Sequence, residues 1–431
     1  MRIGSAIAGC MLLALLAACA SDAPVAQDSG RALTGFSAER LARLDAVLEQ
    51  RIEDGRIAGA VVMLEDDGAI VHRAAFGMAD REAGREMQPD TLFRIASMTK
   101  PVTSVAVMML YEEGHFLLDD PVGAYLPEFD REMSVISFTN DGYELVPAEN
   151  AITIRHLLTH TSGLAYRFMA PEPLPALYAA AGVHDGLGGE DMSLAEFSRR
   201  LAGVPLLHEP GQGWTYGLNT DVLGRLIEVV SGQPFEDFLR TRLFEPLGMR
   251  DTYFLVPPAK RDRLARVYRR DESGTLEPMP DGRIEAGNLV YSVDFPVREE
   301  LEYRSGGGGL VSTAGDYARF LRMLADGGEL DGRRILGPKT IELMFSDQAA
   351  RYGQQSFVGR GFGLGFFVDG GPGQSGQPGS AGIVGWSGLF GTYFWIDPEE
   401  DLVAILMTQQ LPYEERFGPM FRALVYQALL E

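Results

Sequence analysis

Cysteine is nearly absent from this chain of 431 residues, which has only Cys10 and Cys19. Everything after Cys19 therefore lacks the residues for a disulfide, a cysteine nucleophile or a cysteine-ligated metal site. Lysine is almost as scarce, because only Lys100, Lys260 and Lys339 stand among the 38 basic residues. Long apolar runs are lacking beyond the N-terminal segment, and no later segment approaches the length of a membrane span.

Positive charge is in deficit as well. The 60 acidic residues outnumber the basic ones and give a formal net charge of −22 at pH 7. Because proteins bind nucleic acid by neutralising phosphates with Lys and Arg, this balance argues against a nucleic-acid partner. A hydrophobic content of 46% and a charged content of 23% are typical of a globular protein, and 431 residues suffice for two structural lobes.

The N-terminal segment is predicted to lie outside the folded domain. Residues 1–19 combine Arg2, an apolar stretch and small residues before a polar break, as in a secretory signal peptide. The tetrapeptide Leu-Ala-Ala-Cys ending at Cys19 resembles the bacterial lipobox, in which the cysteine becomes the lipidated first residue of the mature chain. An ordinary signal cleaved near Ala20 is the alternative. Because Ala20 and not Asp follows the cysteine, we expect a periplasm-facing lipoprotein, sorted to the outer membrane, whose residues 20–35 are a tether.

Hydrophobic patterning divides the rest of the chain into three parts. Ser37 can cap a helix, and an apolar hairpin follows with its turn at residues 66–68. The middle has helical patterns broken by Pro and Gly, and strand patterns return near the C-terminus. We therefore expect an α/β fold in which residues 36–118 and 311–431 form one antiparallel sheet flanked by helices. Residues 119–310 would form an inserted, mainly helical lobe, with a functional site in the cleft between the parts.

One short motif points to chemistry. In "FRIASMTKPVTSVAVMMLYEEG", residues 93–114, Ser97 and Lys100 lie three residues apart at the head of a helix that is apolar on nearly every face. Helix positions i and i+3 share a face, so the hydroxyl and the amine can lie within hydrogen-bond reach. A serine is a poor nucleophile until a base takes its proton, and a lysine can be that base when burial lowers its pKa. Arginine cannot lose its proton, which makes a rare lysine at this position informative.

The alternative interpretation is structural, with Ser97 as a helix cap and Lys100 as a surface residue. Other motifs favour structural roles too. His156 and His160 have the spacing of a zinc helix, but position 157 is Leu and no third ligand is evident. No G-x-S-x-G nucleophile elbow is present, and four glycines at 306–309 indicate a tight backbone passage instead of a phosphate cradle. We therefore expect no metal and no cofactor.

Four further motifs follow the S-x-x-K motif in order. They are "ITIRHLLTHTSGL" (152–164), "GWTYGLNTDVLGRLIEVVSG" (213–232), "GGGLVSTAGDYARFLRML" (307–324) and "GWSGLFGTYFWIDPEEDLVAILMTQ" (385–409). From about Phe36 to the C-terminus, the chain resembles the serine β-lactamase and penicillin-binding-protein superfamily, specifically its class C β-lactamase-like branch. Within that branch, "WTYGLNTDVLG" and the "WSG" at 386–388 look most like the family VIII carboxylesterases. The resemblance implies an antiparallel α/β sheet domain beside a helical lobe.

The resemblance also implies catalytic roles. Ser97 would attack an acyl carbon, while Lys100 and Tyr216 would move the protons. Which of those two is the principal base stays open. The backbone N–H groups of Ser97 and Leu389 would form the oxyanion hole, where one donor is typically worth ~10²–10³ in turnover.

The implied substrate-binding residues are Trp386, Ser387, Gly388 and Asn219. Two of them depart from the superfamily pattern, in which an asparagine follows two residues after the tyrosine. Here a leucine takes that place and Asn219 comes one position later. Trp386 replaces a cationic or imidazole residue that holds a substrate carboxylate, and an indole cannot pair with one. Both departures favour neutral, apolar acyl substrates; we expect Trp386 in the pocket wall and Trp214 in the core.

These observations predict a serine hydrolase that acts on carboxylic esters of short or medium acyl chains, with weak β-lactam turnover as a side activity. The alternative substrates are β-lactams or cell-wall peptides, for a β-lactamase, a D,D-peptidase or a D-aminopeptidase. A third hypothesis is a non-catalytic envelope binding protein on the same scaffold. The expected partners are a small-molecule ester or amide and, through a lipid on Cys19, a membrane.

Overall fold

An eight-stranded antiparallel sheet organises the computed structural model, which describes residues 35–187, 191–353 and 359–430. The strand order is β14-β15-β16-β17-β18-β1-β2-β3, so β18 from the C-terminal part pairs with β1 from the N-terminal part. The strands are β1 (Gly59–Asp66), β2 (Ala69–Asp80), β3 (Arg85–Glu86), β14 (Arg360–Phe362), β15 (Phe367–Asp369), β16 (Val384–Gly388), β17 (Thr392–Asp397) and β18 (Leu402–Met407).

The predicted signal peptide, Cys19 and nearly all of the predicted tether lie outside the described residues. The described residues from Gly35 onward form one compact unit. No helix in the described ranges combines the length and the apolar character needed to cross a membrane.

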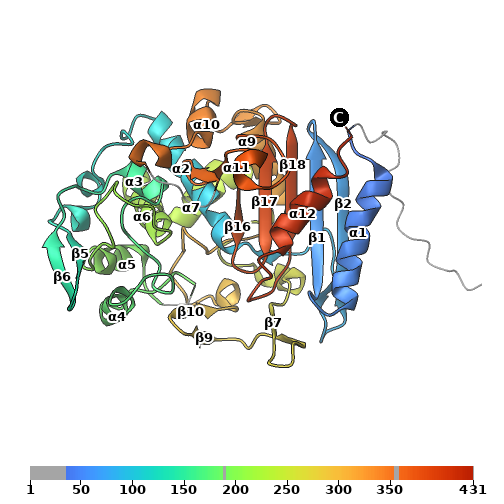
Figure 1. The fold of residues 1–431 in the computed structure, drawn as a ribbon, viewed down its shortest axis with the longest axis horizontal. Coiled ribbons are helices and arrows are strands. Elements are labelled where there is room, and N and C mark those ends of the chain that lie inside the picture. The colour runs from blue at the N-terminus through green and yellow to red at the C-terminus, as the bar shows by residue number, and fades with distance from the viewer. Residues whose placement is uncertain (1–34, 188–190, 354–358, 431) are drawn as a thin grey trace, which may run out of the picture. The chain divides into compact units, whose positions relative to one another are not determined.

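Helices cover both faces of the sheet (Figure 1). On one face, α1 (Ala38–Glu53) and α12 (Phe417–Tyr426) pack against each other and against β2 and β18. Ser37 caps α1 by accepting a hydrogen bond from the Arg40 N–H, as predicted. On the other face, α9 (Ala314–Ala325) packs against β1 and β18. The predicted α/β fold, a sheet built from both chain ends and flanked by helices, is confirmed.

Most of the remaining helices lie between the two sheet-forming segments. They are α2 (Thr99–Glu112), α3 (Ile154–Leu158), α4 (Leu174–Ala180), α5 (Leu194–Leu201), α6 (Asn219–Ser231), α7 (Phe235–Leu239) and α8 (Glu245–Leu247), with α10 (Pro338–Phe345) and α11 (Pro372–Ser375) later in the chain. Sequence patterning missed the small hairpins of this region, because strands of two to six residues give too short an alternating pattern. These strands are β5 (Ser134–Thr139), β6 (Gly142–Pro147), β7 (Tyr268–Arg270), β8 (Leu276–Pro278), β9 (Arg283–Ala286) and β10 (Leu289–Ser292), and the short pairs β4 (Phe93–Arg94) with β11 (Val311–Ser312) and β12 (Glu329–Leu330) with β13 (Arg333–Arg334) complete the set.

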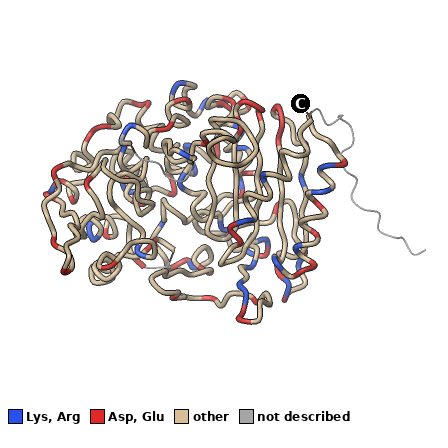
Figure 2. The backbone as a smooth tube through the Cα atoms, viewed as in Figure 1, with Lys and Arg blue, Asp and Glu red and all other residues tan. Residues whose placement is uncertain are grey.

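Helix α2 runs through the core and packs against α6. Every residue from Thr99 to Leu110 is buried, as expected for a helix that is apolar on all sides. Pro101 lies in its first turn, where a missing N–H costs no intrahelical hydrogen bond. Figure 2 shows acidic and basic residues interspersed along the described chain.

Lysine side chains are almost never fully buried unless they are paired. Lys100 is completely buried at the head of α2, so its position needs a chemical explanation.

Candidate active site

Ser97 lies on a short 3₁₀ turn, η1 (Ala96–Met98), that leads directly into α2. Its side chain is half-buried, whereas Ala96 before it is completely buried. Ala96 has a φ of +42°, a left-handed conformation that is costly for a residue with a Cβ. Such strain persists where the surrounding structure enforces it, and it often marks functional sites. The predicted nucleophile thus follows a strained residue.

The Lys100 amine makes three hydrogen-bond contacts. Its Nζ lies 3.2 Å from Ser97 Oγ, 2.8 Å from the Tyr166 hydroxyl oxygen and 2.7 Å from the Gly307 carbonyl oxygen. A neutral lysine amine has two hydrogens and one lone pair. The Gly307 carbonyl can only accept, and the Tyr166 hydroxyl can also accept. When the amine gives its two hydrogens to these oxygens, its lone pair is left for the proton of Ser97.

Burial controls the charge of this amine. Complete burial lowers the pKa of Lys100 to about 7, because the ammonium form loses its hydration. The carboxylate of Asp221 on α6 opposes this shift and raises the pKa of Lys100. Asp221 is itself buried and accepts hydrogen bonds from the Ser305 hydroxyl at 2.7 Å and the Tyr303 hydroxyl at 2.8 Å. Near neutral pH, the amine therefore populates both its neutral and its charged form.

Tyr216 reaches the same serine from the segment just before α6. The Ser97 side chain interacts with the phenol and lowers the pKa of Tyr216, and Trp386 Nε1 donates to the phenol oxygen at 3.3 Å. The Tyr216 ring centroid lies 4.5 Å from Lys100 Nζ. Burial raises the pKa of Tyr216 well above its usual range, so the phenol keeps its proton at neutral pH. The structure therefore brings Ser97, Lys100 and Tyr216 together.

The end of β16 packs against η1. Gly388 is needed there, because a Cβ at this position would collide with the Ile95 carbonyl oxygen. Thr392, which pairs with Gly388 across the β16–β17 turn, donates its hydroxyl to the same carbonyl at 3.4 Å. Leu389 follows Gly388 directly, so the two predicted oxyanion donors, the N–H groups of Ser97 and Leu389, lie on adjoining segments.

Asn219 does not face a ligand, which corrects one predicted substrate contact. Its side chain is completely buried at the start of α6. The amide oxygen accepts a hydrogen bond from the Ser162 hydroxyl. The amide nitrogen donates to His160 Nδ1 at 2.8 Å and to the Leu164 carbonyl at 3.4 Å. With all these groups satisfied inside the protein, Asn219 ties α6 to the segment that follows α3.

Aromatic side chains surround the Tyr216 ring. Trp386 is 6% exposed and packs edge-on against Phe362, while its indole N–H serves the phenol. Trp214, which we expected in the core, is only half-buried and stacks on Tyr216 with their planes 10° apart. Trp214 nevertheless packs against the main core cluster, so the same ring contacts the core and holds the phenol in place. Ser387, between Trp386 and Gly388, is half-buried and lines a separate pocket.

The two histidines at zinc spacing have structural partners. His156 completes a capping box on α3, with its Nδ1 accepting from the Thr153 N–H at 3.2 Å while the Thr153 hydroxyl accepts from the His156 N–H. His160 Nδ1 accepts from Asn219, and burial lowers the pKa of His160 well below its usual value. Across the part of the chain that the structure describes, no three His, Cys, Asp or Glu side chains are placed to hold a metal ion.

Comparison with known proteins identifies the family to which this site belongs. A family model described as Beta-lactamase matches residues 44–428 of the chain. The chain belongs to the beta-lactamase family. This confirms the superfamily that the motifs indicated, and the match spans the sheet, the helical region and all three of Ser97, Lys100 and Tyr216.

Relatives of this beta-lactamase-family chain include esterases. Esterase EstB of Burkholderia gladioli is 38% identical over 403 residues, which cover 91% of this chain and 96% of EstB. The structure of EstCE1, described as a hydrolase with promiscuous acyltransferase activity, has a TM-score of 0.77 and 32% identity and covers 90% of this chain and 98% of its own. The unliganded simvastatin synthase LovD of Aspergillus terreus has a TM-score of 0.73 and 25% identity, with coverages of 90% and 98%.

Three residues of this beta-lactamase-family site were not predicted as functional: Tyr166, Asp221 and Gly307. The glycine run at 306–309 is the tight passage that we predicted, since a Cβ on Gly307 would come within 2.6 Å of Asp221 Oδ2 and 2.9 Å of the Tyr166 hydroxyl. The sequence could not predict that the Gly307 carbonyl accepts a hydrogen bond from Lys100. For Asp221 the sequence does contain one indication, because an acidic residue among the apolar positions of a buried helix needs a partner or a function.

Proposed function

We propose that this beta-lactamase-family protein is a serine carboxylesterase that forms an acyl-enzyme on Ser97. The observation that carries the proposal is the set of contacts around the Lys100 amine. Two acceptors take its two hydrogens, and the lone pair is left for the serine hydroxyl 3.2 Å away. The similarity to esterase EstB and to the hydrolase EstCE1 supports an ester as the substrate.

In the acylation step, Lys100 takes the proton of Ser97 while Oγ bonds to the ester carbonyl carbon. Lys100 is the better base of the two candidates, because burial lowers its pKa to about 7 and raises the pKa of Tyr216. The negative charge moves to the carbonyl oxygen, and the N–H groups of Ser97 and Leu389 stabilise it.

The bond from the carbonyl carbon to the alcohol oxygen then breaks. Tyr216 gives its phenolic proton to the departing alkoxide, and the Lys100 ammonium restores that proton to the phenolate. The indole N–H of Trp386, 3.3 Å from the phenol oxygen, stabilises the transient phenolate. The products of this step are a neutral alcohol, an ester on Ser97 and the catalytic pair in its starting protonation state.

Deacylation repeats the sequence with water in place of the serine. The same base removes a proton from water, the oxygen bonds to the acyl carbon, and the proton returns to Ser97 Oγ as its bond to that carbon breaks. The free acid leaves, and no oxidant, metal or cofactor enters the balance. An alcohol in place of the water would give acyl transfer by the same route.

The surroundings favour a neutral, apolar acyl group. Trp386 offers no positive charge to a substrate carboxylate. Leu389, next to the oxyanion site, belongs to a separate apolar cluster in which Ile284 and Phe295 are also partly buried. An acyl chain of short or medium length can cover this apolar surface and gain ~25 cal/mol for each Å² removed from water.

One comparison of substrates tests the proposal. The purified protein should hydrolyse p-nitrophenyl butyrate with a kcat/KM at least ~10²-fold higher than that for a chromogenic cephalosporin. Intact-mass measurement during ester turnover should show a butyryl adduct on Ser97. A faster cephalosporin reaction would favour the β-lactamase alternative. Failure of both an activated ester and a penicillin to label Ser97 would support the non-catalytic binding alternative.

We also propose that the chain is exported and lipidated at Cys19, and that it faces the periplasm from the outer membrane. The lipobox-like sequence and the Ala after the cysteine support this location. In a Gram-negative host, the wild-type protein should fractionate with outer membranes, whereas Cys19→Ala should lose the lipid and leave the membrane fraction. A wild-type protein found wholly in the soluble fraction would contradict the proposal.

A further inference from the structure

A polar pocket of about 320 Å³, hereafter the Arg94 pocket, opens at the side chain of Arg94, which stands on β4 three positions before Ser97. Its walls come from the end of β2, from residues 261–267 and from the segments on either side of the β9–β10 hairpin. The proposed mechanism does not use this space. Four arginines line it, in a chain whose net charge is −22: Arg85, Arg94, Arg261 and Arg266.

Arg94 is a buried cation without a carboxylate partner. Only 6% of the residue is exposed. Its Nε donates to the Val293 carbonyl, and its Nη1 donates to the Ala265 carbonyl at 2.9 Å. Among the described residues, no carboxylate oxygen lies within 4.0 Å of this guanidinium, and Nη2, which is not fully buried, has no acceptor. A buried charge is costly unless it is paired, so the missing partner needs an explanation.

Arg266 brings a second unpaired charge to the same pocket. It is half-buried, and its two terminal nitrogens have no acceptor in the part of the chain that the structure describes. Burial and, to a smaller extent, the charge of Arg266 lower the pKa of Arg94 to about 9, so both guanidinium groups stay charged at neutral pH. Two like charges therefore lie close together without a carboxylate in contact with either.

The other two arginines of the Arg94 pocket are already paired. Arg85 lies 3.5 Å from a carboxylate oxygen of Asp80. Arg261 lies 2.7 Å from a carboxylate oxygen of Glu299. Among the described residues that line the pocket, the unpaired positive charge thus comes from the first two arginines.

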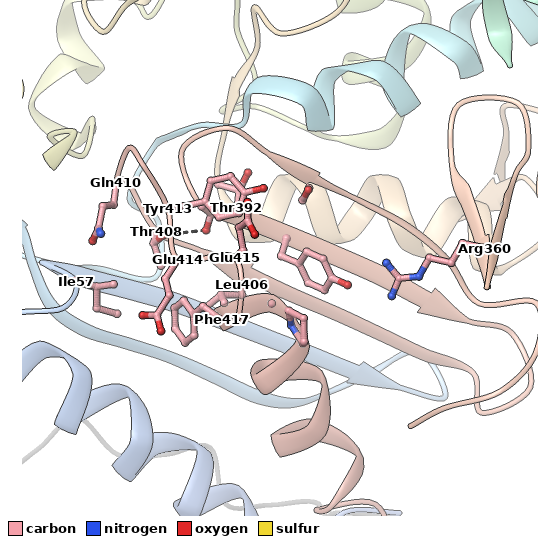
Figure 3. A pocket seen from close by; sticks show the side chains of 15 residues that line it. Ile57, Arg360, Thr392, Leu406, Thr408, Gln410, Tyr413, Glu414, Glu415 and Phe417 are labelled. Carbon is pink, nitrogen blue, oxygen red and sulfur yellow. Dashed lines mark hydrogen bonds between the residues drawn. The ribbon is translucent and has the colours of Figure 1, made fainter. Parts of the chain in front are cut away.

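The pocket of about 180 Å³ between the sheet and the start of α12 provides a contrast (Figure 3). Arg360 lines it and pairs with Asp369 at 3.5 Å. Glu414 lines it too and pairs with Arg51 at 2.8 Å. These two charges are satisfied inside the protein, whereas the two central charges of the Arg94 pocket are not.

We propose that the Arg94 pocket binds a tetrahedral dianion, namely a phosphate group, between the guanidinium groups of Arg94 and Arg266. A guanidinium donates through a planar fork that matches phosphate oxygens. A phosphate carries about −1.5 to −2 charge at pH 7 and can neutralise both arginines, whereas a carboxylate neutralises only one. The pocket is larger than the anion, and Leu264, Val267 and Met279 offer apolar wall to the organic part of a phosphate monoester. This site does not depend on the proposed esterase function.

Two exposed carboxylates at the pocket, Asp262 and Asp281, weaken the site without occupying it. Both line the pocket, but neither lies within 4.0 Å of the nitrogens of Arg94 or Arg266. Exposed charges are screened by solvent and salt, so they oppose the two arginines only in part. The alternative is that Asp281 turns inward and serves as the counter-charge of Arg94.

Calorimetric titration at constant ionic strength tests the site. The wild type should bind inorganic phosphate with a Kd below ~1 mM, and acetate about tenfold more weakly or worse. Arg266→Gln should raise the Kd for phosphate about tenfold or more, because one of two charge-assisted contacts is lost. Arg261→Gln is the matched control, since it removes the same charge from the same pocket at a side chain that Glu299 already holds. Its Kd should stay within about threefold of the wild type.

Glycerol 3-phosphate distinguishes the two sources of such a group. A Kd lower than that for inorganic phosphate would assign the site to a phosphate monoester whose organic part lies on the apolar wall. A higher Kd would assign it to the free ion. Arg266→Lys keeps the charge but loses the fork, so its Kd for phosphate should lie between those of the wild type and Arg266→Gln.

Asp281→Asn decides between a bound anion and an internal counter-charge. If the pocket binds phosphate, this variant should keep its thermal unfolding temperature and bind phosphate more tightly, because a repulsive carboxylate is removed. A lower unfolding temperature in Asp281→Asn, together with a wild type that binds phosphate no better than acetate, would assign Asp281 as the counter-charge and overturn the proposal. A wild-type Kd in both Arg266→Gln and Arg266→Lys would overturn it as well.

Discussion

Replacing Ser97 with alanine is expected to lower kcat for p-nitrophenyl butyrate by ~10⁴-fold or more. Two hydroxyls lie within hydrogen-bond distance of the Lys100 amine: Ser97 at 3.2 Å and Tyr166 at 2.8 Å. Only Ser97 is half-exposed, because Tyr166 is 5% exposed and cannot meet an acyl carbon without leaving the core. Loss of this hydroxyl therefore removes the group that forms the acyl-enzyme, and activity should fall to what binding and the oxyanion donors supply alone.

Ser104→Ala is the matched control for this variant. Ser104 lies on α2 as Lys100 does, is completely buried, and its hydroxyl has no hydrogen-bond partner within the described ranges. Removal of such a hydroxyl costs little, so Ser104→Ala should keep both its activity and its thermal unfolding temperature. If Ser97→Ala retained a tenth or more of the wild-type rate while Ser104→Ala behaved normally, another nucleophile would be required.

The fold and the reactive pair could be predicted from the sequence, because local spacing carries that information. The i, i+3 relation of Ser97 and Lys100 depends on four residues, and it holds whether the turn is 3₁₀ or α-helical. The apolar run after Lys100 gave the burial that lowers the pKa of the amine. Strand patterns at both ends of the chain likewise sufficed for the sheet, since each strand alternates or is apolar over its own length.

Contacts between distant segments could not be predicted in the same way. The oxygens of Tyr166 and Gly307 lie 66 and 207 positions along the chain from Lys100, and no local pattern places them at one amine. Asn219 failed as a prediction for the same reason, since its partners on the segment after α3 turn the amide inward. The contact of Trp214 with Tyr216 could not be predicted either, because a stacked aromatic ring at a site and one in a core have the same sequence signature.

These distant contacts do more than hold the lysine in place. An isolated buried amine would lose its proton and still have an undirected lone pair. The Gly307 carbonyl and the Tyr166 hydroxyl fix two of its directions, and Asp221 keeps its pKa from falling further. The glycine run lets that carbonyl approach, since a Cβ on Gly307 would crowd both Asp221 and Tyr166. The chemistry of this site therefore depends on backbone space as much as on side chains.

Replacing Lys100 with arginine should lower kcat/KM for p-nitrophenyl butyrate by ~10³-fold, because a guanidinium keeps its proton and cannot act as the base. The wild type provides the reference pH profile. The pKa of Lys100 is about 7, and the active form is the neutral amine, so kcat/KM should rise with pH and level off above that value. Below it, the rate should fall about tenfold for each pH unit as the amine becomes protonated. Lys100→Arg should lose this dependence along with its activity.

The chain has only two other lysines, and one of them, Lys339, provides a control for the Lys100→Arg substitution. Lys339 is exposed over 85% of its side chain and pairs with Glu342, so Lys339→Arg should retain full activity and the same pH profile. A buried guanidinium could unfold the Lys100→Arg protein, so Lys100→Met serves as a second variant. It removes the base without burying a permanent charge, and it should be as inactive as Lys100→Arg. A folded Lys100→Met protein with the wild-type rate, or a wild-type profile that stays flat through pH 7, would contradict lysine as the base. The phenol would then have to give up its proton in spite of a pKa that burial raises, and in Lys100→Met the resulting phenolate would have the Trp386 N–H to stabilise it but no ammonium.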